Sequence, residues 1–146
     1  LLYKDVQILA VCAKNKRLFT RLKNKNYPQV KAFGFIDNIQ ELMAASDIII
    51  TKPGGLTISE ILAMELVPVF ISAIPGQEVE NVRVLERYGV GLKVNKIKEI
   101  KDMVLDYNAH PDKLSRIKEN IRKIKKPFAA EELYNVICQG SAGTAG

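Results

Sequence analysis

Short apolar runs and longer amphipathic segments alternate along the chain. Each apolar run has the length of a strand, and a mostly apolar strand suits a parallel sheet that is covered on both faces. Ile48, Ile49 and Ile50 form the centre of one run, and Pro68 stands near the start of another, where a strand tolerates proline best. The runs predicted to form strands are 6–12, 30–35, 47–51, 67–71 and 90–94.

The segments between these runs carry apolar residues at helical spacing. In one of them Val79, Val82 and Leu85 form a stripe, and Gly89 follows as a typical helix terminator. Either Asp37 or Asn38 is expected to cap the start of a shorter helix. The segments predicted to form helices are 15–25, 39–43, 58–65, 77–87, 96–107, 111–125 and 128–138.

Strands and helices thus alternate about five times. This order predicts an α/β fold with a Rossmann-like, doubly wound parallel sheet. In such a sheet ligands bind beyond the carboxyl ends of the strands. Three loops follow strand ends, at 34–35, 52–57 and 72–77, and we expect all three to open on the same edge.

The loop at 52–57 is the first candidate for binding chemistry. It holds Gly54 and Gly55 between an apolar run and a helical segment. Glycine lets a backbone approach a ligand closely, and a helix N-terminus attracts anions such as phosphate. Neither the P-loop motif nor the dinucleotide fingerprint is present. The loop is therefore either a tight connection or a diphosphate site built from backbone N–H groups and the Thr57 hydroxyl.

Polar side chains after this loop also allow two interpretations. Thr57 and Glu60 have the spacing of a capping box, so Glu60 either bonds back to the helix start or accepts hydrogen bonds from ribose hydroxyls. Gln77, Glu78 and Asn81 open the helix at 77–87. They either contact sugar hydroxyls, or the region is an ordinary acidic helix start that Glu78 and Glu80 satisfy.

Composition narrows the class of protein. The chain has 146 residues, of which 47% are apolar, enough for one domain with its own core. No apolar run approaches the roughly 18 residues that span a bilayer. Cys12 and Cys138 lie far apart in the sequence, and we expect both to be reduced thiols in a cytoplasmic protein. One histidine, His110, and two distant cysteines offer no metal-ligand cluster, so we expect no metal site.

The net charge of +6 is concentrated in two clusters. Each is either a solvated helix face, which we favour for either cluster alone, or a contact for nucleic acid or an anionic membrane surface. Aromatic residues are not interleaved with the basic ones, which argues against a stacking platform for single strands. The clusters are Lys14, Lys16, Arg17, Arg21, Lys23 and Lys25, and Lys113, Arg116, Lys118, Arg122, Lys123, Lys125 and Lys126.

The segments 47–60 and 74–81 together resemble the nucleotide-sugar half of a GT-B glycosyltransferase. They are most similar to the monogalactosyldiacylglycerol synthase and processive diacylglycerol glucosyltransferase family, which is related to the peptidoglycan N-acetylglucosaminyltransferase. Segments 11–15 and 33–43 support the likeness, which covers roughly residues 7–94. The likeness is more specific for the fold and the donor than for the acceptor.

The resemblance implies a role for each candidate residue. Gly54, Gly55, Leu56 and Thr57 would hold the diphosphate of a UDP-sugar, and Glu60 would hold the ribose. Phe35 and its neighbours would meet the uracil. The residues implied in donor-sugar binding are Gln77 and Glu78, supported by Asn81, with Asn15 as a further candidate near the same edge.

The same resemblance implies an inverting transferase that moves a hexose from a UDP-sugar to diacylglycerol or a related lipid. The UDP-sugar is a substrate, and no cofactor or metal is expected. We expect a cytoplasmic protein at the periphery of the membrane, with an anionic membrane surface as a further partner and no nucleic acid. The alternatives are a related GT-B enzyme, either a cell-wall N-acetylglucosaminyltransferase or a UDP-sugar epimerase, or a non-catalytic nucleotide-binding module.

The resemblance also predicts the domain organisation. Residues 1–139 would form the UDP-sugar-binding domain, and 140–146 a disordered tail. We expect the first strand and glycine-rich loop of the donor half to precede this chain. The half that supplies the acceptor site and the catalytic base is expected elsewhere in the protein, so this chain alone would be inactive.

Overall fold

The computed structural model describes residues 6–94, 96–129 and 131. Each apolar run forms a strand within these residues, and every strand pair is parallel. The α/β fold with parallel strands is therefore confirmed. The strands are β1 (Ile8–Val11), β2 (Val30–Phe33), β3 (Ile48–Thr51), β4 (Val67–Phe70) and β5 (Leu92–Lys93).

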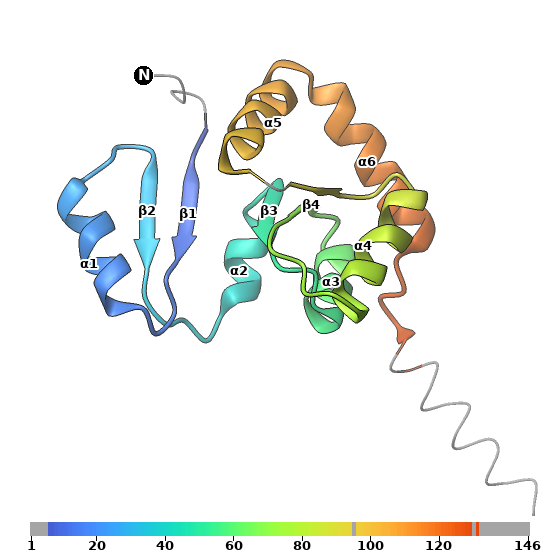
Figure 1. The fold of residues 1–146 in the computed structure, drawn as a ribbon, viewed down its shortest axis with the longest axis horizontal. Coiled ribbons are helices and arrows are strands. Elements are labelled where there is room, and N and C mark those ends of the chain that lie inside the picture. The colour runs from blue at the N-terminus through green and yellow to red at the C-terminus, as the bar shows by residue number, and fades with distance from the viewer. Residues whose placement is uncertain (1–5, 95, 130, 132–146) are drawn as a thin grey trace, which may run out of the picture.

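Helices alternate with the strands as the apolar spacing predicts (Figure 1). They are α1 (Lys16–Lys25), α2 (Ile39–Ala44), α3 (Gly55–Ala63), α4 (Gln77–Arg87), α5 (Ile97–Ala109) and α6 (Pro111–Ile124). Most of the helix predicted at 128–138, together with Cys138 and the tail at 140–146, falls outside the described residues.

The structure agrees with the predicted end of one helix but not with the predicted cap of another. The end of α4 is as predicted: Gly89 has a φ of 66°, its N–H donates to Glu86 O, and Val90 N–H donates to Leu85 O. The start of α2 is different. Asn38 occupies the N-cap position, but its side chain makes no capping hydrogen bond. The cap predicted from Asp37 or Asn38 is therefore wrong, because a suitable residue type does not ensure the rotamer that capping needs.

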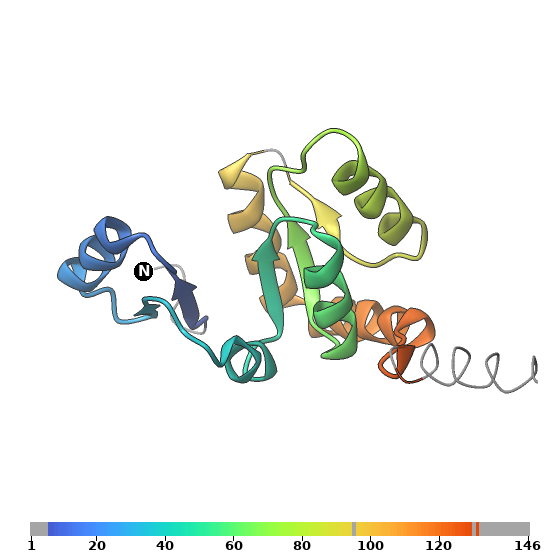
Figure 2. The same cartoon turned by 90° about the horizontal axis from the view of Figure 1, so that it is seen from below.

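The strands belong to two sheets, whereas the sequence led us to expect one. β1 pairs with β2, and the second sheet has the order β3-β4-β5. The arrows of β1 and β2 extend along the plane of Figure 1, whereas those of β3 and β4 extend along the plane of Figure 2, which is turned by 90°. The strands of the two sheets therefore point in different directions. The loop at Gly34 and Phe35 follows β2. It therefore does not share a sheet edge with the loops after β3 and β4, as we had expected, because periodicity identifies strands but not their partners.

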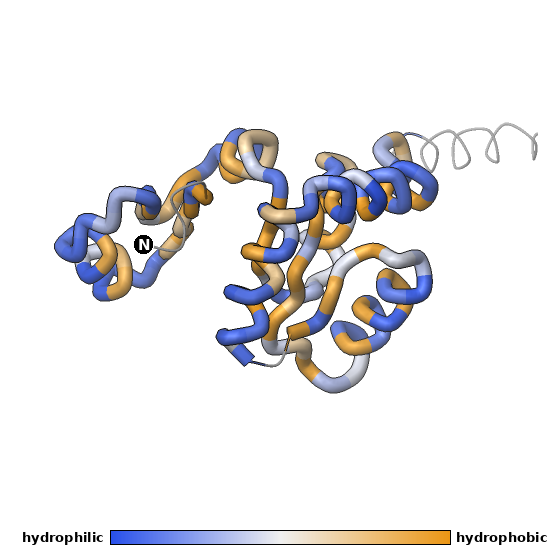
Figure 3. Tube along the Cα trace, turned by 90° about the horizontal axis from the view of Figure 1, so that it is seen from above, coloured by the Kyte–Doolittle hydropathy of each residue, from blue (hydrophilic) through white to orange (hydrophobic). Residues whose placement is uncertain are grey.

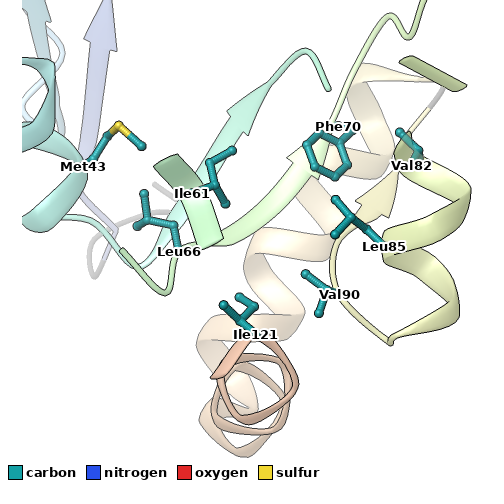
Figure 4. Close-up of a cluster of buried hydrophobic side chains, with 8 residues drawn as sticks. All are labelled: Met43, Ile61, Leu66, Phe70, Val82, Leu85, Val90 and Ile121. Atoms are coloured by element: carbon teal, nitrogen blue, oxygen red, sulfur yellow. The ribbon is translucent and has the colours of Figure 1, made fainter. Parts of the chain in front are cut away.

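The core lies on the three-stranded sheet. α5 and α6 cover one face of this sheet, and α3 and α4 cover the other (Figure 1). All four residues of β4 are buried, as a central parallel strand requires. Phe70 of β4 belongs to one buried cluster with side chains from α2, α3, α4, α6 and two connecting segments (Figure 4): Met43, Ile61, Leu66, Val82, Leu85, Val90 and Ile121.

Ion pairs attach α6 to this core. Glu65 lies in the turn between α3 and β4, and its carboxylate accepts from Arg122 Nε and Lys125 Nζ, both at 2.7 Å. Lys118 Nζ donates to Asp47 at 3.0 Å. The hydrogen bonds from Lys125 and then Arg122 hold the pKa of Glu65 below its ordinary value of 4.5. The second basic cluster is thus partly neutralised by the fold itself.

We expect Glu65→Gln to lower the free energy of unfolding near neutral pH. Because the folded pKa is depressed, the stabilisation is fully present above about pH 4.5 and is lost as the pH falls through the folded pKa. Urea unfolding of wild type and variant should therefore differ at neutral pH and converge in acid. Glu119→Gln removes an exposed α6 carboxylate and serves as the control. A gap that stays constant with pH would contradict the ion-pair explanation.

Candidate functional site

The candidate site is built around the start of α3. This helix begins at Gly55, three residues before the predicted start at Ile58, with Gly54 as its N-cap. Its first intrahelical bond runs from Ile58 N–H to Gly54 O at 2.9 Å. The N–H groups of Gly55, Leu56 and Thr57 therefore have no helical acceptor. The residues assigned to a diphosphate form one first turn, at the positive end of the helix.

Of the two interpretations of Thr57 and Glu60, the capping box does not form. Because α3 starts at Gly55, Thr57 lies inside the helix and cannot be its N-cap. The helix was predicted to start at Ile58 because the two glycines were assigned to a turn. At the first positions of a helix, however, glycine interrupts no hydrogen-bonded turn. Glu60 is exposed and makes no side-chain hydrogen bond or ion pair to the described residues. Its carboxylate is therefore free to bind a ligand.

Neither glycine at the helix start is required by the protein's own packing. Gly54 has a φ of −69°, and Gly55 is not among the residues with positive φ. A Cβ added at Gly55 would meet open space, and one at Gly54 would approach only Thr57 Oγ1, at 3.9 Å. Space is thus left in front of the free N–H groups, as close approach by an external group requires.

The start of α4 lies against this loop. Asn81 Nδ2 donates to Pro53 O at 3.1 Å, which ties α4 to the residues before α3. Glu78 Oε2 accepts from Ile74 N–H at 2.8 Å and closes the preceding loop. Gln77 is exposed at the first position of the helix. The loops after β3 and β4 therefore lie next to each other, and the predicted sugar-binding residues lie beside the predicted diphosphate residues.

Sequence reasoning missed the partner that positions Asn81. That partner is the backbone carbonyl of Pro53, which is buried. A carbonyl oxygen is present at every residue, so no pattern of residue types marks the one that is used. The amide of Asn81 was visible as a candidate, but its role in joining two loops depends on the tertiary structure.

Two predicted site residues lie at the other sheet. Phe35 follows β2 and its side chain is 65% exposed. Asn15 follows β1, and its Oδ1 accepts from Leu18 N–H at 3.0 Å, so it caps α1. The structure places both after strands of the two-stranded sheet and does not join them to the start of α3.

The remaining ionisable candidates lie apart from this site. Cys12 is a buried free thiol. His110 precedes α6, with Nδ1 at 3.0 Å from Asp106 Oδ1, while Lys113 holds the pKa of Asp106 below its ordinary value. In the part of the chain that the structure describes, no group of three or more His, Cys, Asp or Glu residues is arranged to hold a metal ion. None of the described helices is long and apolar enough to span a bilayer.

Comparison with known proteins identifies a family and a fold. The model of the glycosyltransferase family 28 C-terminal domain matches residues 2–133. A processive diacylglycerol beta-glucosyltransferase of Bacillus pumilus is 32% identical over 144 residues, which cover 97% of this chain and 38% of that protein. The Bacillus subtilis protein of the same name is 34% identical over 145 residues, covering 96% of this chain and 38% of its own length. The chain thus spans about two fifths of these relatives.

Two solved structures share the fold at low identity. MurG of Acinetobacter baumannii superposes with a TM-score of 0.74 and 16% identity, covering 94% of this chain and 43% of MurG. The glycotransferase of kitacinnamycin superposes with a TM-score of 0.56 and 12% identity, covering 89% of this chain and 43% of that protein. At these identities the likeness shows the fold alone.

We expect Asn81→Ala to lower the free energy of unfolding by about 1 kcal/mol, because Pro53 O loses a partly buried hydrogen bond. Urea unfolding would measure the change, and amide exchange should show faster opening of the loop at 52–57. Gln77→Ala removes an exposed amide from the same helix and should change little. Equal effects of the two substitutions would show that the Pro53 contact does not hold the loops together.

Proposed function

Because this chain belongs to the glycosyltransferase family 28 C-terminal domain family, we propose that it binds the UDP-sugar donor of an enzyme that glycosylates a lipid. One observation carries the proposal. The start of α3 combines three free N–H groups with two glycines that the packing does not require and a carboxylate, Glu60, that has no partner among the described residues.

The start of α3 suits a diphosphate. The N–H groups of Gly55, Leu56 and Thr57 point out of the first turn, and the Thr57 hydroxyl adds a donor on the same turn. As the bond to the sugar breaks, negative charge grows on the departing UDP. The helix dipole and these N–H groups stabilise that charge in this proposal, so the UDP-sugar is a substrate and no separate cofactor is invoked.

Ribose and donor sugar are assigned to the neighbouring side chains. Glu60 lies three residues after Thr57 and so shares its helix face, where a carboxylate accepts from vicinal ribose hydroxyls. Glu78 uses one oxygen for Ile74 N–H and keeps the other for a sugar hydroxyl. Gln77 is exposed beside it and available to the sugar. We assign Asn81 an indirect role: its amide nitrogen donates to Pro53 O, which holds the start of α4 beside the start of α3.

Uracil binding by Phe35, and a contribution of Asn15 to the same donor site, require the two sheets to meet. Among the described residues, the strand orders β2-β1 and β3-β4-β5 match a six-strand dinucleotide-type order that lacks one strand between β1 and β3. Ile8, Val11 and Ile50 are 40–45% exposed, which is unusual in parallel strands. We assign this position to the expected first strand of the donor half, with its glycine-rich loop. Pairing there would bring Phe35 and Asn15 to the edge that holds Gly55.

The acceptor is assigned from the relatives. Two proteins named processive diacylglycerol beta-glucosyltransferase share 32–34% identity with nearly the whole chain. We propose that the full-length protein transfers a hexose to diacylglycerol or a related lipid, at the periphery of the cytoplasmic membrane. A general base that deprotonates the acceptor hydroxyl is assigned to the other half of the enzyme. A cell-wall N-acetylglucosaminyltransferase, a UDP-sugar epimerase and a non-catalytic module are the competing outcomes.

We expect Glu60→Ala to weaken UDP binding by the full-length protein about 10- to 100-fold, because a charge-assisted hydrogen bond to ribose is lost. Isothermal titration with UDP would measure the change. Glu86→Ala removes an exposed carboxylate from α4 and should leave the affinity unchanged. Binding of 2′,3′-dideoxy-UDP should not respond to Glu60→Ala. A variant that binds UDP normally would contradict the ribose role, and wild-type protein that does not bind UDP would contradict the proposed function.

We expect the full-length protein to transfer hexose from UDP-glucose or UDP-galactose to diacylglycerol in detergent or vesicles. Radiolabelled donor and separation of the lipid products would measure transfer and identify the preferred sugar. Glu60→Ala should lower transfer at limiting donor, with Glu86→Ala as the control. Transfer to a non-lipid acceptor alone, or epimerisation of the donor without transfer, would overturn the lipid assignment.

A further inference from the structure

The net positive charge of the molecule is concentrated in the segment that forms β1, α1 and β2, which lies to one side in Figure 1. Every charged residue between positions 6 and 36 is basic. These residues are Lys14, Lys16, Arg17, Arg21, Lys23, Lys25 and Lys31. The whole chain has a net charge of +6, so this part carries the entire excess, and the remainder is close to neutral.

The fold treats the two basic clusters differently. In the second cluster, on α6 and the residue after it, five basic side chains form ion pairs with carboxylates: Lys113, Arg116, Lys118, Arg122 and Lys125. In the β1–α1–β2 part, all seven basic side chains are exposed, and among the described residues none makes an ion pair or a hydrogen bond through its side chain. Only the α1 cluster is therefore available in full to an external anion.

The exposed charges form one face of α1. Leu18, Phe19 and Leu22 are half-buried, and α1 packs against β2 of the two-stranded sheet. Figure 3 shows hydrophilic and hydrophobic residues sharing this helix, as an amphipathic helix requires. The outward face is continuous and consists of Lys16, Arg17, Thr20, Arg21, Asn24 and Lys25. At 1.5 Å per residue it is about 15 Å long, enough to contact several lipid headgroups at once.

Lys23 and Lys25 lie in the last turn of α1, where positive charge suits the negative end of the helix dipole, but the remaining charges do not stabilise the helix. Arg17, Arg21 and Lys25 follow one another at four-residue spacing, and like charges at that spacing destabilise a helix. The first turn of α1 contains no acidic residue that would favour its positive end. An internal structural role therefore accounts for Lys23 and Lys25 but not for Lys16, Arg17 and Arg21, whereas an anionic partner accounts for all of them.

A lipid surface suits this face better than a nucleic acid. Lys23 Nζ lies 5.1 Å from the centre of the Phe19 ring, Lys25 Nζ 5.8 Å from that of Tyr27, and Lys31 Nζ 5.4 Å from that of Phe33. Each of these aromatic rings thus already has a lysine ammonium group over one side. It is therefore a poor stacking platform for nucleic-acid bases. Tyr27, 45% exposed beside the charged face, is a residue type enriched at membrane–water interfaces.

We propose that the outward face of α1 docks on an anionic phospholipid surface. The proposal rests on the proposed function, since a lipid acceptor requires the donor site to work close to a membrane. Docking through α1 would hold the donor half at the surface by its own contact, in addition to any contact made by the rest of the enzyme.

The test is vesicle co-sedimentation of the full-length protein. The variant Arg17→Gln/Arg21→Gln/Lys25→Gln removes three charges from the face. Arg87→Gln/Lys98→Gln/Lys101→Gln removes three exposed charges elsewhere and is the matched control. Each charge near an anionic surface is worth about fivefold in partitioning, so the α1 variant should bind phosphatidylglycerol-containing vesicles roughly 100-fold more weakly. The control should bind nearly as wild type, and added salt should abolish the difference.

Titration with UDP in the same samples separates this proposal from the proposed function. The α1 variant should keep wild-type UDP affinity and an unchanged circular dichroism spectrum. Equal vesicle binding by the α1 variant and its control would overturn the docking proposal, whether or not UDP binds. Binding to pure phosphatidylcholine as strong as to anionic vesicles would also overturn it. So would tighter binding of the α1 face to an RNA oligonucleotide than to anionic vesicles.

Discussion

Parallel pairing of β3 with β4 is the constraint on which the candidate site depends. Thr51 lies opposite Phe70, and Ile71 N–H donates to Thr51 O at 2.9 Å, so both strands end at the same level. The loops after them therefore open side by side, and α3 and α4 begin next to each other. A single side-chain bond, from Asn81 to Pro53 O, then joins the two helix starts. The positive ends of two helices thereby face one region.

In the proposed donor site, this arrangement would make few side chains necessary for binding. Backbone N–H groups at the start of α3 require no particular side chain, only a helix that begins at Gly55 and space in front of it. The core provides the rigidity behind them, since Ile61 of α3 is fully buried. In the proposed function, the polar side chains of Glu60, Gln77 and Glu78 are then reserved for sugars, whose hydroxyl groups need directed acceptors.

The two basic clusters show how the fold changes the meaning of a charge pattern. Both are rich in lysine and arginine in the sequence, and either one alone is compatible with a solvated helix face. Packing of α6 on the core brings Glu65 and Asp47, which are distant in the sequence, against its basic side chains. No carboxylate lies between positions 6 and 36, so α1 has no local partner. Neutralisation of Lys118, Arg122 and Lys125 is therefore a property of the tertiary structure, whereas Arg116 is paired within its own helix.

The sequence by itself determined the strands and most of the helices, and it marked the residues at the start of α3 and α4. These are local properties: apolar period, glycine position and helix-start chemistry act over a few residues. Only the tertiary structure decided that the strands form two sheets, that Phe35 and Asn15 lie away from Gly55, and that Glu60 is not a cap. Each of those outcomes depends on which distant segments pair or on where a helix begins in its packed context. No local pattern of residues encodes such contacts.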